Sequence, residues 1–300
     1  MLRTIQQAGR AISFLSITFL LAVPATSVSA QGTVIEEGSV VTGPVETTNE
    51  PIRVGADVTI DGVVRTRNGP ITIGARSEVG HVSTQNGPVQ IAALVQVAGG
   101  IETRNGPIEV GANGMVRDGV TTRNGEIDLG AGTIVGGSVG TENGQIGLGD
   151  GARVDGSVVT RNGAVSLGAN SRVHGDVETR SGEVVARTGA SIDGRVEARN
   201  GPVRLADARV GRDVDVHRGD VHLRGASEIE GDLIVLMPEE PAWISWIPFF
   251  GNPDPVVRID ADARVGGRLI VDERAELEIE PGADVPEAQR YTSREAWPGR

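Results

Sequence analysis

The sequence contains no cysteine and no lysine, and aromatic residues make up only 3% of its 300 residues. The lack of cysteine excludes disulfides and also excludes a lipid anchor on a cysteine. The lack of rings argues against the two compact globular domains that this length would normally suggest. All 28 basic residues are arginine, and 40 acidic residues outnumber them, for a formal net charge of −12. This balance argues against nucleic-acid binding, which requires a basic footprint.

Glycine is abundant, with 43 residues, and many of these glycines follow a regularly spaced polar residue. The spacing between successive corners is 18 or 19 residues, which is typical of a solenoid. The corner residues are Asn49, Asn68, Asn86, Asn105, Asn124, Asn143, Asn162, Ser181, Asn200 and Arg218.

Within one repeat, aliphatic and variable residues alternate. If the coil that starts at Thr103 is numbered 1 to 19, positions 6 and 8 are aliphatic (Ile108 and Val110), whereas position 7 between them varies. Positions 14 and 18 are also aliphatic, and position 1 is threonine in most coils. Period-two alternation places positions 6 and 8 inside and position 7 outside. Threonine gives way to valine or alanine in later coils, so the threonine column is predicted to lie inside as well.

The pattern predicts an all-β chain that folds as a single-stranded parallel β-helix of about twelve coils, with three short strands per coil. The 19-residue coil with unequal sides favours the right-handed form over the 18-residue left-handed form. We expect a partial coil over 31–46, repeats over 47–235, final coils over 256–285 and a mobile tail over 286–300. The Asn-Gly corner is expected to require a backbone with positive φ, which glycine adopts freely.

The first thirty residues have the pattern of a signal peptide. A basic start containing Arg3 and Arg10 precedes an apolar stretch over 12–23, and small residues end at Ala30. We therefore expect 1–30 to direct export to the periplasm, cell envelope or medium. The apolar stretch is too short to favour a spanning helix.

One segment, 236–255, interrupts the repeat and is rich in proline and aromatic residues. It is expected to replace a single Asn-Gly corner. One interpretation is a lid over apolar surface of the solenoid. The alternative is a contact for a membrane surface or a partner. The residues predicted for that contact lie within 243–250 and are Trp243, Ile244, Trp246, Ile247, Phe249 and Phe250.

Arginine recurs at position 2, where neighbouring coils bring side chains to about 4.8 Å spacing. The predicted stripe comprises Arg67, Arg104, Arg123, Arg161, Arg180 and Arg199. Like charges repel unless they are compensated, and Glu102, Glu178 and Glu197 at position 19 are candidates for this. The alternative is that the stripe binds an anionic polymer such as an envelope polysaccharide.

Few residues are arranged for catalysis or for cofactor binding. Glu109 and Asp128 at position 7 resemble the paired carboxylates of glycan-cleaving β-helix enzymes, but long loops form the clefts of those enzymes. The four histidines lack metal-ligand spacing, and the glycine cluster over 147–151 is not followed by a helix, so no phosphate loop is expected. We expect no catalytic residue, metal or cofactor.

Short units such as Val154-Asp-Gly156-Ser-Val158 resemble those of the bactofilin, or polymer-forming cytoskeletal, family. The resemblance covers roughly 40–280 and implies a right-handed β-helix that polymerises end to end. The corners Ser181-Gly-Glu-Val184 and Arg218-Gly-Asp-Val221 resemble an exported putative adhesin family with S-G-[DE]-[IV] units. Together these features favour an exported, non-enzymatic structural or adhesive rod, with a glycan-binding module as the alternative.

Overall fold

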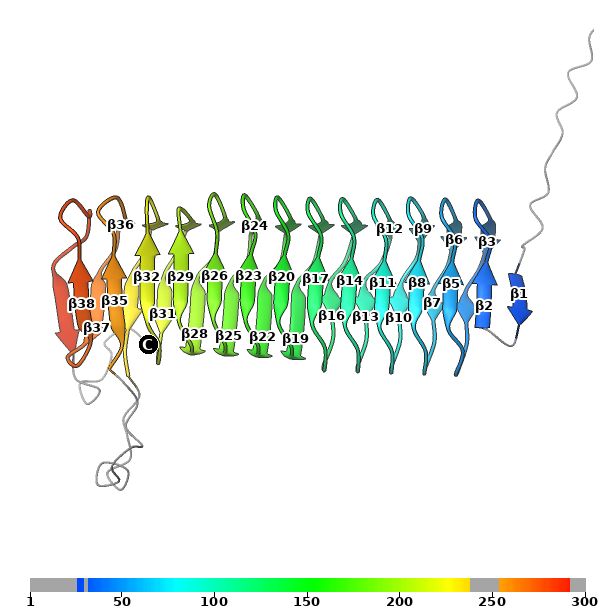
Figure 1. Cartoon of the computed structure of the whole chain (residues 1–300), viewed down its shortest axis with the longest axis horizontal. Helices are drawn as coiled ribbons and strands as arrows, with labels where there is room; N and C mark the ends of the chain where they lie inside the picture. The colour runs from blue at the N-terminus through cyan, green and yellow to red at the C-terminus, as the bar shows by residue number, and fades with distance from the viewer. Residues whose placement is uncertain (1–25, 30–31, 238–253, 292–300) are drawn as a thin grey trace, which may run out of the picture.

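The computed structural model describes residues 26–29, 32–237 and 254–291. The described chain is all-β and forms a parallel β-solenoid of about 13 turns, drawn as a rod in Figure 1. The predicted fold class is confirmed. Each turn contributes one strand to each of three sheets, which line the three sides of the rod.

Sheet 1 contains the strands that carry positions 6 to 8. In spatial order they are β1 (Thr26–Ser29), β2 (Gly32–Ile35), β5 (Ile52–Val54), β8 (Ile71–Ile73), β11 (Val89–Ile91), β14 (Ile108–Val110), β17 (Ile127–Leu129), β20 (Ile146–Leu148), β23 (Val165–Leu167), β26 (Val184–Ala186), β29 (Val203–Ala206), β32 (Val221–Arg224), β35 (Val256–Ile259) and β38 (Glu276–Ile279).

Sheet 2 contains the short strands around position 14. They are β3 (Val40–Thr42), β6 (Thr59–Asp61), β9 (Glu78–Val79), β12 (Gln96–Val97), β15 (Met115–Val116), β18 (Ile134–Val135), β21 (Arg153–Val154), β24 (Arg172–Val173), β27 (Ser191–Ile192), β30 (Arg209–Val210), β33 (Glu228–Ile229) and β36 (Arg264–Val265).

Sheet 3 contains the strands that begin at position 18. They are β4 (Val45–Glu46), β7 (Val64–Arg65), β10 (Val82–Ser83), β13 (Ile101–Glu102), β16 (Val120–Thr121), β19 (Val139–Asn143), β22 (Val158–Asn162), β25 (Val177–Ser181), β28 (Val196–Asn200), β31 (Val214–Val216), β34 (Leu233–Val235), β37 (Leu269–Asp272) and β39 (Ala288–Tyr291).

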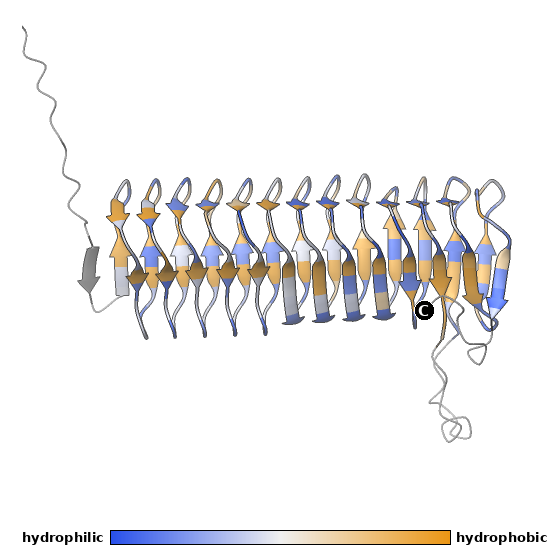
Figure 2. Ribbon diagram, turned by 180° about the vertical axis from the view of Figure 1, so that it is seen from behind, coloured by the Kyte–Doolittle hydropathy of each residue, from blue (hydrophilic) through white to orange (hydrophobic). Residues whose placement is uncertain are grey.

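The predicted inward positions form one continuous core. In the coil from Thr103, Ile108, Val110, Val116 and Val120 are each at most 1% exposed, and they pair in register with the equivalent residues of the next coil. Figure 2 shows the apolar residues recurring at the same level from coil to coil. Removing such aliphatic side chains from water is the main favourable term, about 1.5–3 kcal/mol each.

Both ends of the rod differ in detail from the sequence prediction. The segment over 286–300 was expected to be a mobile tail, but β39 within it pairs in parallel with β37, so the solenoid continues to Tyr291. At the other end, β1 lies inside the predicted signal segment. It pairs with β2 in the only antiparallel pairing among the described strands.

The Asn-Gly corner depends on close approach between coils and, in several coils, on a positive φ at the glycine. A Cβ on Gly125 would overlap the carbonyl oxygen of Gly106 in the preceding coil, and the same overlap recurs at the equivalent glycines along the stack. None of the corner asparagines has a positive φ. The predicted positive φ occurs at the glycine in five coils, with φ of 147° to 158° at Gly87, Gly106, Gly182, Gly201 and Gly219. Glycine is needed there also because nothing larger fits between the backbones.

A left-handed helical backbone, with φ near 60°, occurs at position 11, in the corner between sheets 1 and 2. Asn113 and Asn170 have φ of 55° there, Gly151 has 67°, and Leu94 has 63°. Glycine and asparagine tolerate this region, whereas a leucine does not. Since the Leu94 side chain is half exposed, packing does not compensate for the strain.

We predict that Leu94→Asn stabilises the protein by about 0.5–1 kcal/mol, because asparagine tolerates the left-handed region better than leucine. Urea unfolding followed by far-UV circular dichroism would measure the change. Leu94→Ala is the matched control, since it removes the side chain but keeps a Cβ on the same backbone. Equal stabilisation by alanine would show that backbone strain is not the cause.

We also predict that Gly125→Ala destabilises the protein by about 3 kcal/mol or more, because the two coils must separate to admit the methyl group. Gly151→Ala should cost only about 1 kcal/mol, since its backbone is left-handed but its Cβ would meet open space. The same unfolding assay compares the two. A reversed order of cost would contradict the close-approach explanation.

Candidate functional site

The threonine column at position 1 lies inside the rod, as the sequence predicts. Thr84, Thr103 and Thr122 are between 6% and 8% exposed. Each hydroxyl donates a hydrogen bond to a glycine carbonyl at the corner of the preceding coil; Thr122 donates to Gly106 at 3.1 Å. The threonines therefore satisfy backbone carbonyls, and they form the floor of a shallow face on sheet 3.

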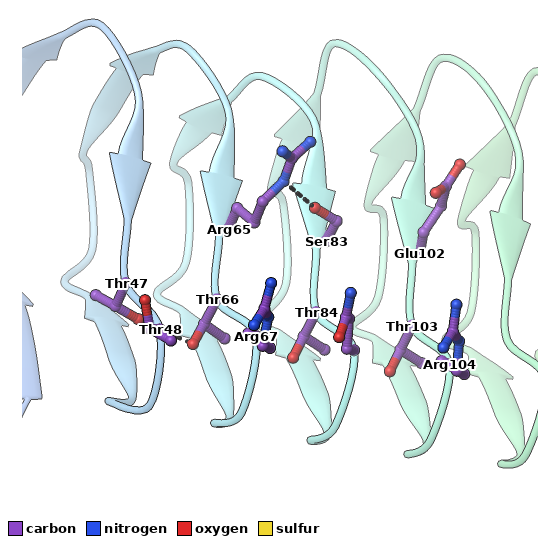
Figure 3. Close-up of a pocket in the computed structure, with 11 residues that line it drawn as sticks. Thr47, Thr48, Arg65, Thr66, Arg67, Ser83, Thr84, Glu102, Thr103 and Arg104 are labelled. Atoms are coloured by element: carbon purple, nitrogen blue, oxygen red, sulfur yellow. Dashed lines mark hydrogen bonds between the residues drawn. The ribbon is translucent and has the colours of Figure 1, made fainter.

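Two grooves follow this face, each between a row of position-19 and a row of position-2 side chains. The N-terminal groove has a volume of about 540 Å³. It is lined by Thr47, Thr48, Arg65, Thr66, Arg67, Ser83, Thr84, Gln85, Glu102, Thr103 and Arg104 (Figure 3). The C-terminal groove has a volume of about 260 Å³. It is lined by Thr141, Glu142, Val159, Thr160, Arg161, Glu178, Thr179, Arg180, Glu197 and Arg199.

All six arginines of the predicted stripe are exposed at the surface, but they are not equivalent. Arg123 and Arg161 both lie within ion-pair distance of Glu142, at 3.7 and 3.3 Å. Arg199 pairs with Glu197 at 3.0 Å. In the part of the chain that the structure describes, the guanidinium groups of the other three members form no ion pair or hydrogen bond. These members are Arg67, Arg104 and Arg180.

The expected compensation by position-19 glutamates is only partly correct. Glu197 does pair with Arg199, but Glu178 pairs with Arg195 at 3.3 Å and Glu102 pairs with no described arginine. The hydrogen bond to Glu178 is the main reason that the pKa of Arg195 is raised. Glu142, which the prediction missed, interrupts the stripe. Its position-2 place between Arg123 and Arg161 was readable in the sequence.

The Asn side chains at position 3 form a ladder along the edge of this face. Each amide donates to the amide oxygen of the preceding coil, at 2.7 to 2.8 Å, from Asn162 back to Asn49. Ser181 ends the ladder, and Asn200 donates to the Arg180 carbonyl at 3.1 Å instead. The amides are thus occupied in stacking the coils.

Glu109 and Asp128 lie on the opposite sheet, paired in register on β14 and β17. They line a hollow of about 580 Å³ that continues over Gly147 and Ser166. Burial raises the pKa of Asp128, and the neighbouring charges of Glu126 and Glu109 raise it further. A carboxyl with a raised pKa beside a second carboxylate has the chemistry of an acid–base pair. The strands here are joined by short corners, so no long loop encloses a substrate.

Two of the four histidines, His174 and His222, lie close to aspartates, and the four do not form a cluster. His174 Nδ1 lies 3.0 Å from Asp155, and His222 Nε2 lies 3.3 Å from Asp260. No group of three or more histidine, aspartate or glutamate side chains within residues 26–29, 32–237 and 254–291 could hold a metal ion.

The aromatic segment predicted to contact a membrane or partner lies outside the described residues, because these omit 238–253. Its insertion point is described. Val235 pairs with Val216 and Val271, and Val257 pairs with Val221, so 236–255 replaces one Asn-Gly corner as the sequence predicts. None of the described residues forms a helix that is long and apolar enough to cross a membrane.

A buried carboxylate, which sequence reasoning missed, holds the start of this segment. Asp272 is fully buried at the end of β37 and accepts hydrogen bonds from the backbone N–H of Met237 at 3.2 Å and from Arg274 Nε at 2.9 Å. Burial alone would raise the pKa of Asp272. The hydrogen bonds from Arg274 and Met237 outweigh burial and hold the pKa below its usual value.

Comparison with known proteins gives no match: no protein-family model, no curated protein and no solved structure is similar to this chain.

We predict that Asp272→Asn destabilises the last coils by about 2 kcal/mol, since it removes a charge-assisted hydrogen-bond centre. The pKa of Asp272 is lower in the folded state than its value of 3.8 in the unfolded chain. Its contribution to stability is therefore complete above pH 3.8 and is lost as the pH falls from there towards the folded pKa. Urea unfolding at pH 7 and below pH 4 would measure the effect. Asp284→Asn, at a side chain that is 79% exposed, is the control. Equal loss in both variants would contradict the proposed role.

Proposed function

We propose that this protein is an exported, non-enzymatic structural or adhesive rod of the cell envelope. The observation that carries the proposal is the stack of about 13 turns, in which short corners join the coils everywhere except at 236–255. Long loops build the clefts of catalytic β-helices, and the described coils are joined by tight turns. A straight rod with a continuous aliphatic core is suited to holding two structures of the envelope at a fixed distance. It is less suited to enclosing a substrate.

Self-association end to end, which the bactofilin-like units imply, is the finer part of this proposal. At the C-terminal end, β38 and β39 are the last described strands of sheets 1 and 3. An open strand edge offers unpaired N–H and C=O groups to another chain. The other end begins with β3 and β4 in sheets 2 and 3, which offer the same kind of edge.

Both ends are acidic, which imposes a condition on polymerisation. Glu36, Glu37 and Glu46 are exposed near the first coil, and Glu276 and Glu280 are exposed in the last coil. These like charges would repel when the ends meet. Since salt screens exposed charges, polymers should form more readily at higher ionic strength.

We expect electron microscopy of residues 31–300 to reveal filaments that lengthen with protein concentration and with salt. Glu276→Gln should lower the salt needed for filaments by removing one repelling charge, whereas Glu109→Gln in the middle of the rod should not. Monomeric rods at every concentration and salt would contradict polymerisation and leave the rod to act as a monomeric adhesin or spacer.

A second function, binding of an anionic envelope polymer, is favoured by one specific observation. Arg67, Arg104 and Arg180 are exposed and form no ion pair with any described residue, in a chain with a net charge of −12. Exposed, uncompensated cations on an acidic protein are available to an external anion.

A further inference from the structure

The two grooves of sheet 3 carry different charge, although both belong to the same repeat. The C-terminal groove contains three arginines and three glutamates, and ion pairs connect Arg161 to Glu142 and Arg199 to Glu197. The N-terminal groove contains three arginines but only one acid, Glu102. Arg65 lies 3.9 Å from Glu46 outside the groove, whereas Arg67 and Arg104 form no ion pair within the described part of the chain. Available positive charge is therefore concentrated in the N-terminal groove.

The polar groups of the N-terminal groove form two parallel rows (Figure 3). Arg65, Ser83 and Glu102 form one row, and Arg65 Nε donates to the Ser83 hydroxyl at 3.1 Å. Arg67, Gln85 and Arg104 form the other row, at position 2 of three successive coils. The guanidinium groups of Arg67 and Arg104 point to the same side, and the buried threonines lie between the rows.

Charged and neutral side chains alternate along the second row. Successive coils are about 4.8 Å apart, so Arg67 and Arg104 are separated by about 10 Å, with the neutral amide of Gln85 midway. One coil spacing is comparable to the length of one sugar in an extended polysaccharide. A chain that lies along the rod would therefore present an acidic group at every second sugar to match this row.

The lining excludes the other common linear polyanions. Single-stranded nucleic acids need aromatic side chains for base stacking, and the groove has none. A peptide cannot add as a strand here, because β7, β10 and β13 are each paired on both sides. Hydroxyl and amide groups of Thr48, Ser83 and Gln85 instead match a hydroxyl-rich ligand.

We propose that the N-terminal groove binds a linear polysaccharide in which acidic and neutral sugars alternate, with acidic groups on Arg67 and Arg104 and a neutral sugar over Gln85. This inference rests on the polymer-binding function proposed above and names its location and ligand class. It does not depend on whether the rods polymerise.

The test measures binding of residues 31–300 to three soluble probes by isothermal titration calorimetry at low ionic strength. Hyaluronate carries a carboxylate on every second sugar, polygalacturonate on every sugar, and dextran on none. We expect hyaluronate to bind most tightly and dextran not to bind. Arg67→Gln with Arg104→Gln should weaken hyaluronate binding about tenfold, and added salt should abolish it.

The matched control is Arg161→Gln with Arg199→Gln, which changes the same number of charges in the C-terminal groove at two arginines already paired with Glu142 and Glu197, and should leave hyaluronate affinity unchanged. Circular dichroism of both variants tests that the fold is intact. Equal weakening in both variants would overturn the groove assignment while leaving polymer binding in place. Tighter binding of polygalacturonate than of hyaluronate would overturn the proposal that the ligand alternates acidic and neutral sugars. Absence of binding to both charged probes would overturn the polymer-binding function itself, and filament formation would still test the scaffold separately.

Discussion

The close approach of successive backbones at the Asn-Gly corner is the constraint on which the rest of the structure depends. At this corner the carbonyl of one residue occupies the space that a Cβ on the next coil's glycine would need, so the coils stack only if that following residue is glycine. The polar groups that this contact brings together are satisfied locally. Threonine hydroxyls donate to the glycine carbonyls, and the asparagine amides bond to one another along the rod. Glycine, asparagine and threonine therefore act together as one corner motif that stacks the coils.

This corner motif leaves the outward-facing positions free to vary, and the residues at these positions determine the surface charge of the rod. Position 2 carries arginine in most coils, yet a single glutamate, Glu142, neutralises two of these arginines because the coil spacing places it between them. The same coil backbone thus carries two grooves of different charge, because only the outward-facing side chains differ. The same freedom lets Asp128 lie beside Glu109 with a raised pKa on the opposite sheet.

The one large departure from the repeat is attached by an interaction of a different kind. Asp272 is buried in the position-2 column, where many other coils carry an exposed arginine and one carries Glu142. Its carboxylate binds the backbone where the chain leaves the solenoid at Met237. Burying a carboxylate is costly unless hydrogen bonds satisfy it, and here Arg274 and Met237 supply them. The start of the 236–255 segment is thus held to the solenoid by a specific hydrogen bond as well as by the chain itself.

The sequence by itself determined the all-β solenoid, the coil length, the inward columns exemplified by Ile108 and Val110, and the insertion point of 236–255, because each depends on a periodic pattern that side-chain hydrophobicity reveals. It did not reveal the small-residue column at position 12, where Ser77 and Thr133 are buried, because small polar residues resemble solvent-exposed ones in sequence. It also missed the left-handed backbone at position 11 and the contacts of Glu142, Arg195 and Asp272. Those contacts join residues 17 to 35 positions apart in the chain. Only the tertiary stacking decides which charges meet, which glycines touch, and which arginines remain free.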